Sequence, residues 1–413
     1  MSFLYNLFIF FYRVAIYVAS FTGNVKAKLW ISGRKNGFDR IQQKLNAGEQ
    51  RIWFHCASLG EFEQGRPVIE KFRLLFPDYK VVLTFFSPSG YEVRKNYSGA
   101  DYIFYLPIDT RANARKFISL VNPEKVFFVK YEYWYYYFDE LKKRNIQLFL
   151  LSAIFRPGQR FFQWYGYFFR HMLKSVSHFF VQDDQSATLL NSIGITNSTV
   201  TGDTRFDRVV EVAAIVKSIP LIEKFMAGKK IMIAGSTWEK DEQLLRRAYS
   251  ELRTICYKLI IVPHEINEKR IDQLIRMLSD FKVVKFSEAK EETISSAEIL
   301  VIDNIGMLSS LYQYGSLAYI GGGFGSGIHN ILEAAVFGMP VFFGPNYQKF
   351  REANELVACG GAFSINSFEE LKSGMMNFFN EEKKLSAASS VTKKYVHDRK
   401  GATENILEFV KGK

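Results

Sequence analysis

The chain has 413 residues, of which 48% are hydrophobic and 23% are charged; this is typical of a globular protein and long enough for two domains. Its net charge of +12 limits the expected partners to anionic ones: nucleic acid, an anionic membrane or phosphorylated substrates. Cys56, Cys256 and Cys359 form no CxxC pair, which excludes a disulfide framework and fits a reducing compartment. We expect each cysteine to be a small core residue.

Residues 2–22 are almost wholly apolar and about long enough to span a bilayer, but Arg13 near the middle makes a clean span costly. A signal peptide fits poorly, because no positive charge precedes the apolar run. A basic cluster follows directly: Lys26, Lys28, Arg34 and Lys35. We expect residues 1–22 to anchor the chain to a membrane, with the cluster facing the cytoplasm or anionic lipid heads. The alternative is a helix packed on the protein's own domain.

Short apolar stretches predict the strands of a first domain. They lie at residues 51–55, 81–85, 103–106, 126–129, 148–151 and 179–181. Helical stretches separate them, which predicts a parallel, doubly wound sheet. Glu61 lies in the turn after the first strand, at a helix N-terminus and at the carboxyl end of a strand, where such sheets bind ligands. The alternative role for Glu61 is a favourable interaction with the helix dipole alone.

Aromatic and basic residues alternate between residues 156 and 180. The basic ones are Arg156, Arg160, Arg170 and Lys174, and seven aromatic residues lie among them between residues 161 and 169. This composition suits a membrane interface or a phosphorylated lipid, and it also suits single-stranded nucleic acid. A buried aromatic helix is the third interpretation.

A second series of strands is predicted after a linker or helix at residues 209–229. The strands lie at residues 230–234, 258–262, 282–284 and 299–302, and at the start of the segment 318–345. Gly235, Ser236 and Thr237 form a strand-to-helix turn that offers backbone N–H groups and two hydroxyls to a phosphate.

The segment 318–345 reads as a strand, a glycine cluster, a helix over residues 329–337 and a second strand. Its glycines allow a backbone to approach a phosphate, and a helix N-terminus behind them favours an anion. Glu333 follows His329 by four residues, so both lie on one helix face, where the carboxylate can accept hydrogen bonds from ribose hydroxyls. The alternative is a glycine-rich turn followed by a solvated Glu.

Several motifs occur together in a characteristic order. They are HCASLGE (55–61), TFFSPSGYE (84–92), YLPIDT (105–110), KYEYW (130–134), TGDTRFD (201–207), AGSTWEKDE (234–242) and GGGFGSGIHNILEAA (321–335). The ordered set covers almost the whole chain and resembles the 3-deoxy-D-manno-octulosonic acid (Kdo) transferases of lipopolysaccharide synthesis.

This resemblance implies an α/β, GT-B glycosyltransferase fold with two Rossmann-like domains facing across a cleft and an N-terminal membrane-associated helix. The expected parts are an anchor (1–22), an acceptor domain (23–208), a linker (209–229), a donor domain (230–398) and a helix returning to the first domain (399–413). The resemblance also implies CMP-Kdo as donor and a lipid A precursor as acceptor. We then expect the protein at the anionic cytoplasmic face of the inner membrane, with no nucleic acid as partner.

By residue, the resemblance assigns Glu61 as the catalytic base and Glu132 as a second essential acid. Expected donor-binding residues are Gly235, Ser236, Thr237, Pro263, His264, Gly306, Met307, Gly323, His329, Asn330 and Glu333. Expected contacts to the acceptor or to the donor carboxylate are Ser58, Gly60, Ser89 and Arg205. Arg205 replaces the family's usual lysine, so a guanidinium fork would carry that role.

Neither a DxD motif nor a His/Cys/Asp cluster with metal-ligand spacing occurs in the sequence, so we predict a metal-independent, inverting transferase without a cofactor. One rival keeps the fold and changes the donor, giving a UDP-sugar transferase or epimerase. The other is a basic, membrane-attached or RNA-binding protein without catalysis. Two glycine turns of the nucleotide-binding type, together with Glu61 and Glu132 in separate loops, argue against that second rival.

Overall fold

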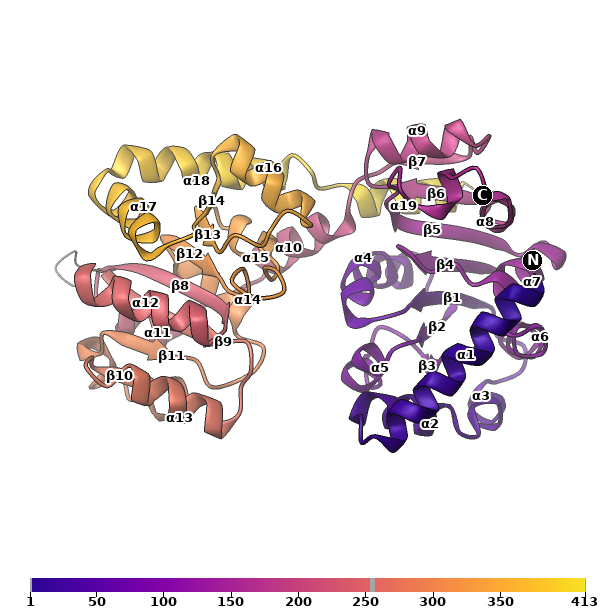
Figure 1. The fold of residues 1–413 in the computed structure, drawn as a ribbon, viewed down its shortest axis with the longest axis horizontal. Coiled ribbons are helices and arrows are strands. Elements are labelled where there is room, and N and C mark those ends of the chain that lie inside the picture. Colours follow the sequence, from indigo (N-terminus) through magenta and orange to yellow (C-terminus); the bar gives the residue numbers. More distant parts are fainter. Residues whose placement is uncertain (1, 253–256, 413) are drawn as a thin grey trace. The chain divides into compact units, whose positions relative to one another are not determined.

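A computed structural model describes residues 2–252 and 257–412, so Cys256 lies outside the described residues. The chain divides into two compact units (Figure 1). Unit 1 comprises residues 1–208 and 400–413, and unit 2 comprises residues 209–399. Each unit contains one seven-stranded sheet whose neighbouring strands all pair in parallel. The predicted α/β class with two Rossmann-like domains is therefore confirmed.

The unit 1 sheet has the strand order β3-β2-β1-β4-β5-β6-β7. Its strands are β1 (Arg51–Cys56), β2 (Lys80–Phe85), β3 (Tyr102–Tyr105), β4 (Lys125–Val129), β5 (Gln147–Ala153), β6 (His178–Val181) and β7 (Ser198–Val200). The six predicted strands are all present, and the short edge strand β7 was not predicted. The order reverses direction between β1 and β4, as in doubly wound nucleotide-binding folds.

Helices cover both faces of this sheet. They are α1 (Ser2–Phe21), α2 (Val25–Arg34), α3 (Gly37–Lys44), α4 (Leu59–Leu75), α5 (Pro88–Arg94), α6 (Arg111–Val121), α7 (Tyr135–Lys143), α8 (Tyr167–Leu173), α9 (Asp184–Ser192) and α19 (Ala402–Lys411). Alternate residues of β1 point to opposite cores: Phe54 packs with α4 and α19, whereas Trp53 packs with α6 and α7. This alternation fixes the direction of every side chain that follows the strand.

The last helix, α19, belongs to unit 1 although it follows unit 2 in the chain. Its Ile406, Leu407 and Val410 are buried against the α4 face of the sheet. The carboxylate of Asp207 accepts hydrogen bonds from the backbone N–H groups of Gly401 and Thr403, the latter at 2.7 Å. A buried carboxylate therefore holds the returning segment at the start of its helix.

Unit 2 begins within α10 (Thr204–Ala214) and has the strand order β10-β11-β9-β8-β12-β13-β14. Its strands are β8 (Lys230–Thr237), β9 (Tyr257–Pro263), β10 (Val283–Lys285), β11 (Ile299–Val301), β12 (Leu317–Ile320), β13 (Val341–Phe343) and β14 (Ala362–Ser364). Its helices are α11 (Pro220–Met226), α12 (Glu239–Leu252), α13 (Glu268–Met277), α14 (Leu308–Leu311), α15 (Leu332–Ala335), α16 (Arg351–Cys359), α17 (Phe368–Asn380) and α18 (Glu382–His397). The direction reverses between β8 and β12.

Two local expectations are wrong, and one strand of unit 2 was not predicted. The helix predicted over residues 329–337 is only the four-residue α15, and His329 lies in the extended loop before it. β14 was not predicted, because three residues carry too little alternation to be recognised as a strand. Cys359 is exposed at the end of α16, whereas Cys56 is buried as expected.

Candidate active site

The two candidate acids of unit 1 follow the two strands at which the sheet reverses direction. Glu61 comes just after β1, and Glu132 comes just after β4. In open α/β sheets, the loops at this point diverge to opposite faces and leave a crevice at the carboxyl ends of the strands. Residues that are 71 positions apart in the chain are thus brought to one edge of the sheet by topology alone.

Glu61 is held at the first turn of α4 by its own N-cap residue. Its Oε2 accepts hydrogen bonds from the Ser58 backbone N–H and from the Ser58 hydroxyl, both at 2.7 Å. Burial raises the pKa of Glu61, and the negative charge of Glu132 raises it further against the opposing effect of the Ser58 hydrogen bonds. Its second carboxylate oxygen appears in none of these bonds, so Glu61 can accept a proton while it remains anchored.

Glu132 is oriented by the side chains of Trp134 and His55. The indole N–H of Trp134 donates to Glu132 Oε2 at 2.7 Å. His55 Nε2 lies 3.5 Å from the same oxygen. This imidazole is fully buried, and its Nε2 has no hydrogen-bond partner among the residues that the structure describes. A buried polar nitrogen without a partner marks a place where a hydrogen bond can form during function.

Thr84 connects His55 to its other neighbours. Trp53 Nε1 can only donate, and it donates to Thr84 Oγ1 at 2.7 Å. The Thr84 hydroxyl lies 2.8 Å from His55 Nδ1 and donates to the carbonyl oxygen of Phe54 at 3.4 Å. In the tautomer that carries its hydrogen on Nε2, His55 directs that hydrogen toward Glu132, whose Oε2 is 3.5 Å away. Sequence reasoning missed this residue, although it opens the HCASLGE motif.

Arg205 lies near the same site and is oriented by Asp203. Its Nε donates to Asp203 Oδ2 at 2.9 Å, and the backbone N–H of Arg205 donates to Oδ1. Burial opposes ionisation of Asp203, but the Arg205 guanidinium holds the pKa of that carboxyl below its ordinary value. The charges of Arg156, Arg205 and Glu61 all act on the phenol of Tyr131, so these groups surround one region of unit 1.

The loop after β2 packs against the loop that carries Ser58. The backbone N–H of Ser87 donates to the Ala57 carbonyl at 2.7 Å, and a Cβ at Gly90 would lie 3.1 Å from the Ser58 backbone. Ser89 is exposed, and its hydroxyl lies 2.9 Å from that of Ser87. Ser58, Gly60 and Ser89 are therefore brought to one surface next to Glu61.

A cavity of about 1050 Å³ opens beside Glu132. It is lined by α1, by the 131–134 loop and by the aromatic-basic segment, with Tyr131, Trp134 and Arg156 on its wall. Arg156 and Arg160 are exposed, whereas the Arg170 guanidinium donates to the backbone carbonyls of Phe161 and Gln163. The aromatic-basic segment is therefore part surface and part core, so it is not the wholly buried helix of the third interpretation.

Unit 2 also places its candidates where its sheet reverses direction. The backbone N–H of Gly321, after β12, donates to the Gly235 carbonyl in β8 at 2.9 Å. A Cβ at Gly323 would lie 2.5 Å from the Gly344 backbone, so no side chain fits there. The glycine loop therefore packs closely against neighbouring backbone. Its first glycines are needed for this packing, in addition to any space that they leave for a ligand.

A buried carboxylate ties the glycine loop to α12. Asp241 accepts hydrogen bonds from the hydroxyl of Tyr319 at 2.8 Å, from the backbone N–H of Trp238 at 2.9 Å and from the backbone N–H of Gly322 at 3.0 Å. Asp241 is almost completely buried. Asp241 thus fixes the glycine loop relative to the turn that precedes α12. It was not among the residues predicted from the sequence.

Three rings form a stack at the edge of these loops. His264 stacks on Trp238, at a centroid distance of 4.7 Å, and on His329, at 4.2 Å. The indole N–H of Trp238 donates to His329 Nε2 at 3.2 Å, so the hydrogen of a neutral His329 resides on Nδ1. Burial and the neighbouring His264 both lower the pKa of His329. The stack therefore presents an uncharged N–H donor at neutral pH.

The remaining donor candidates surround the same loops. Asn330 donates to Glu333 Oε1 at 2.9 Å, and its own Oδ1 accepts from the backbone N–H of Leu332. Thr237 is buried and its hydroxyl donates to Glu242, whereas Ser236 is partly exposed in a left-handed conformation with φ 54°. Pro263 ends β9, and Gly306 and Met307 precede α14. The Thr237 hydroxyl would have to leave Glu242 to reach a ligand.

Comparison with known proteins indicates the family that the chain resembles. Residues 33–208 match the family model described as 3-deoxy-D-manno-octulosonic-acid transferase (kdotransferase), a span that contains Glu61, Glu132 and Arg205. Over this span the chain is similar to the Kdo transferase family. The matched span also contains most of the motifs on which the resemblance rested, so the resemblance is confirmed, and with it the glycosyltransferase class.

The individual similarities are distant but extensive. A 3-deoxy-D-manno-octulosonic acid transferase of Chlamydia muridarum is 24% identical over 369 residues, which cover 87% of this chain and 85% of that protein. A bifunctional glycosyltransferase/methyltransferase of Fusobacterium nucleatum is 25% identical over 348 residues, or 81% of this chain. The chain spans about half (53%) of that protein's length.

Among solved structures, the UDP-GlcNAc 2-epimerase of Neisseria meningitidis bound to UDP-GlcNAc superposes with a TM-score of 0.62 and 15% identity. The alignment covers 88% of this chain and 100% of that one. At this identity the similarity concerns the fold alone, and it supports the predicted GT-B type of architecture.

Proposed function

We propose that the protein transfers Kdo from CMP-Kdo to a phosphorylated lipid A precursor of the lipid IVA type, without a metal ion and with inversion. The observation that carries this proposal is the pair Glu61 and Glu132 at the switch point of unit 1, inside the span that matches the family. Burial and Glu132 together raise the pKa of Glu61, which brings a carboxylate closer to the pH at which a general base works best.

In the proposed reaction, Glu61 removes the proton from the acceptor hydroxyl. The acceptor oxygen then forms a bond to the anomeric carbon of Kdo, while the bond from that carbon to the CMP phosphate breaks. The electron pair of the broken bond leaves with the phosphate, and the proton remains on Glu61. Attack opposite to the leaving phosphate inverts the anomeric centre, and Glu132 and Arg205 orient the reacting groups.

Unit 2 is proposed to hold CMP. Glu333 lies beyond the glycine loop, where its carboxylate can accept hydrogen bonds from ribose hydroxyls. His329 Nδ1–H and the Ser236 hydroxyl are the proposed donors to the phosphate. A neutral imidazole suits this role, because it donates without adding a charge that would hold the product CMP too tightly.

The large cavity of unit 1 is the proposed acceptor site. Its walls are mostly aromatic, which suits acyl chains, and its exposed Arg156 and Arg160 suit the phosphates of the acceptor. Arg156 and Tyr131 both line this cavity, and the charges of Arg156 and Glu61 both act on the Tyr131 phenol, which supports an acceptor site close to the proposed base. An acceptor with both acyl chains and phosphates would contact the aromatic walls with its acyl chains and the two arginines with its phosphates.

Membrane association is proposed to occur through α1. This helix is long and apolar enough to cross a membrane by length and composition, but one of its faces packs on unit 1. Ile9 is buried with Trp30 and Ile108, and the Tyr136 hydroxyl donates to Asn6 at 2.7 Å. The other face exposes Phe8 by 61% and further large apolar residues along its length. A helix held along one side suits the bilayer interface, since crossing would break these contacts.

The test compares nucleotides and products. CMP should raise the melting temperature of the protein more than UDP does at equal concentration, because the donor is a cytidine monophosphate sugar. Incubation with freshly generated CMP-Kdo and a tetraacyl lipid A precursor should then yield a heavier lipid. A larger shift with UDP, or consumption of UDP-GlcNAc without an acceptor, would favour the epimerase-like alternative instead.

A further inference from the structure

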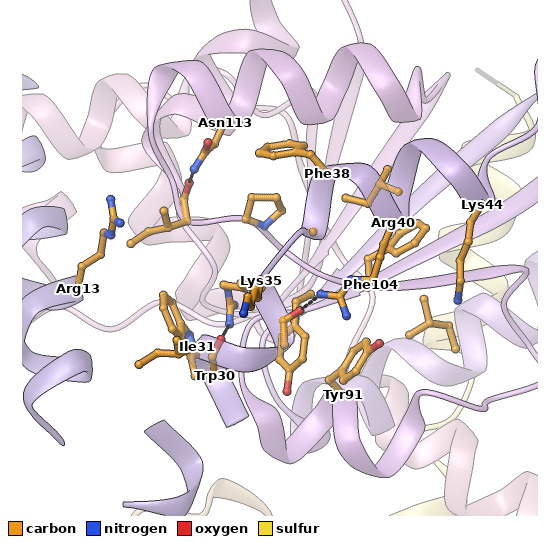
Figure 2. Close-up of a pocket in the computed structure, with 18 of the residues that line it drawn as sticks. Arg13, Trp30, Ile31, Lys35, Phe38, Arg40, Lys44, Tyr91, Phe104 and Asn113 are labelled. Carbon is orange, nitrogen blue, oxygen red and sulfur yellow. Dashed lines mark hydrogen bonds between the residues drawn. The ribbon is translucent and has the colours of Figure 1, made fainter. Parts of the chain in front are cut away.

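A second cavity in unit 1, apart from the proposed acceptor site, is strongly basic. It has a volume of about 500 Å³ and is enclosed by α1, α2, α3 and the β3 edge of the sheet. Figure 2 shows Arg13 on α1 at one side of this cavity, Lys35 near its middle, and Arg40 and Lys44 of α3 at the other side. The residues that line it include four exposed cations and no Asp or Glu.

These four cations differ from the basic residues of unit 1 that form ion pairs. Arg66, Arg94 and Arg144 pair with carboxylates at 2.7–2.8 Å. Within the described residues, by contrast, Arg13, Lys35, Arg40 and Lys44 form no ion pair with a carboxylate. Like charges gathered around one cavity repel each other, so the arrangement costs stability unless an anion enters. The cavity is therefore matched to an anionic ligand.

The walls of the cavity are rigid and partly apolar. Beneath it, the Arg34 guanidinium lies 4.0 Å from the Trp30 ring and donates to the carbonyl oxygens of Phe86, at 2.7 Å, and Leu106, at 3.0 Å. Tyr91 and Tyr105 stack at 4.0 Å on another side. Arg34 thus serves the structure, and Arg40 donates to the carbonyl oxygen of Gly33. The charges of all four exposed cations remain without a carboxylate partner among the described residues, and they suit a ligand that also has a small apolar part.

The position of the cavity indicates where this ligand comes from. Arg13 lies on α1, the helix whose outward face exposes Phe10, Val14 and Phe21. A helix with such a face sits at the boundary between lipid headgroups and acyl chains. The cationic cavity on the inner side of α1 would then lie at the level of the lipid phosphates. Arg13 would extend from α1 to the phosphate in the cavity.

We propose that this cavity binds the phosphate headgroup of an anionic membrane phospholipid. The bound lipid would hold α1 at the membrane surface, and the site is separate from the residues proposed for transfer. Binding is therefore measurable without CMP-Kdo, and the proposal stands or falls independently of the transferase activity.

The first test is vesicle cosedimentation of the full-length protein, with vesicles of phosphatidylcholine and phosphatidylglycerol. Lys35→Ser/Lys44→Ser should weaken binding by about tenfold or more, as expected for two charges next to an anionic surface. The matched control is Lys142→Ser/Lys400→Ser, which removes the same charge from exposed lysines outside the cavity. An equal loss in both variants would overturn the proposal, because net charge alone would explain it.

A second variant keeps every charge and fills the cavity. Ile31 lines the cavity and is partly exposed, so Ile31→Trp adds volume inside it. Binding to the vesicles should fall by a similar factor although net charge is unchanged; retained binding would overturn the assignment of a defined pocket. A thermal melt of each variant establishes that it is folded, and Asn113→Trp in the same cavity replaces Ile31→Trp if that variant fails to fold.

A soluble probe distinguishes the lipid from free phosphate. Glycerol 1-phosphate, added at constant ionic strength, should compete with the vesicles only weakly, because the proposed ligand is held by the bilayer as well as by the cavity. Complete release by millimolar glycerol 1-phosphate would contradict the membrane source and indicate a site for a soluble phosphate ester.

Discussion

Replacing Glu61 with Gln separates the chemistry of this residue from its structural role. The Gln side chain has the same shape, and its amide oxygen can still accept the hydrogen bond from the Ser58 backbone N–H, which is 2.7 Å long in the structure. It cannot accept a proton from the acceptor. Glu61→Ala would be a poorer choice, since it also removes the hydrogen bonds from Ser58 that complete the capping box of α4.

The expected loss of activity follows from the role of a general base. Such a group contributes about a hundredfold or more to turnover, which corresponds to about 2.7 kcal/mol of transition-state stabilisation. Both kcat and kcat/KM should fall together, because the interaction is made only in the transition state. The affinity for CMP should not change, since the proposed nucleotide residues lie in unit 2.

The same substitution should leave stability at neutral pH unchanged or higher. Folding raises the pKa of Glu61, chiefly by burial. A group with a raised folded pKa contributes stability that is present below its unfolded pKa and is lost as the pH rises through the folded pKa. At pH 7 the ionised Glu61 therefore lowers the free energy of unfolding, and a neutral Gln removes this destabilisation.

The assay measures both quantities on one preparation. Turnover is followed as lipid product by mass spectrometry, and stability as the denaturant midpoint at pH 5 and pH 7. The reasoning predicts an inactive protein whose stability gain, if any, is larger at pH 7 than at pH 5. Near-normal turnover would refute the assignment of Glu61 as base, and a large loss of stability at pH 7 would refute the account of its pKa.

Four further changes test the other residues. Glu132→Ala should abolish turnover while CMP binding by calorimetry persists; loss of CMP binding would show that its domain assignment is wrong. His55→Gln should lower turnover by up to about tenfold, as for one lost hydrogen bond, and should move the acid limb of the pH–rate profile, whereas a purely structural role would change only the melting temperature. Glu333→Ala should weaken CMP by about 1.5–3 kcal/mol, and an unchanged calorimetric affinity would count against the ribose contact. Arg156→Ser/Arg160→Ser should raise the acceptor KM at unchanged CMP affinity, and an unaltered KM would mean that acceptor phosphates bind elsewhere.

The fold was predictable because its signals are local and repeated. Apolar strands of three to eight residues alternate with helical stretches, and this pattern alone predicts a parallel sheet. The failures occurred where local signals are weak or where tertiary contacts decide. The predicted helix at His329 is a loop because its N–H donates to the Gly321 carbonyl at 3.2 Å, a contact between the two ends of the glycine turn.

The candidate site was predictable only in part, for a related reason. Glu61 and Glu132 stand at strand ends, which sequence patterns locate, and family motifs marked them. Their environment depends on partners distant in the chain: His55 acquires its orientation from Thr84, and Asp241 acquires its role from Tyr319. No sequence spacing relates such residues to each other, so their roles can be recognised only in the folded structure.

The most direct test of the proposed function is the mass of the lipid after incubation of the purified protein with freshly generated CMP-Kdo and a tetraacyl lipid A precursor. The account predicts a product heavier by one or more whole Kdo residues, with CMP released in equal amount, and neither of these with Glu61→Gln. An unchanged lipid with the wild-type chain, or a lipid that gains mass only when a UDP-sugar replaces CMP-Kdo, would contradict it.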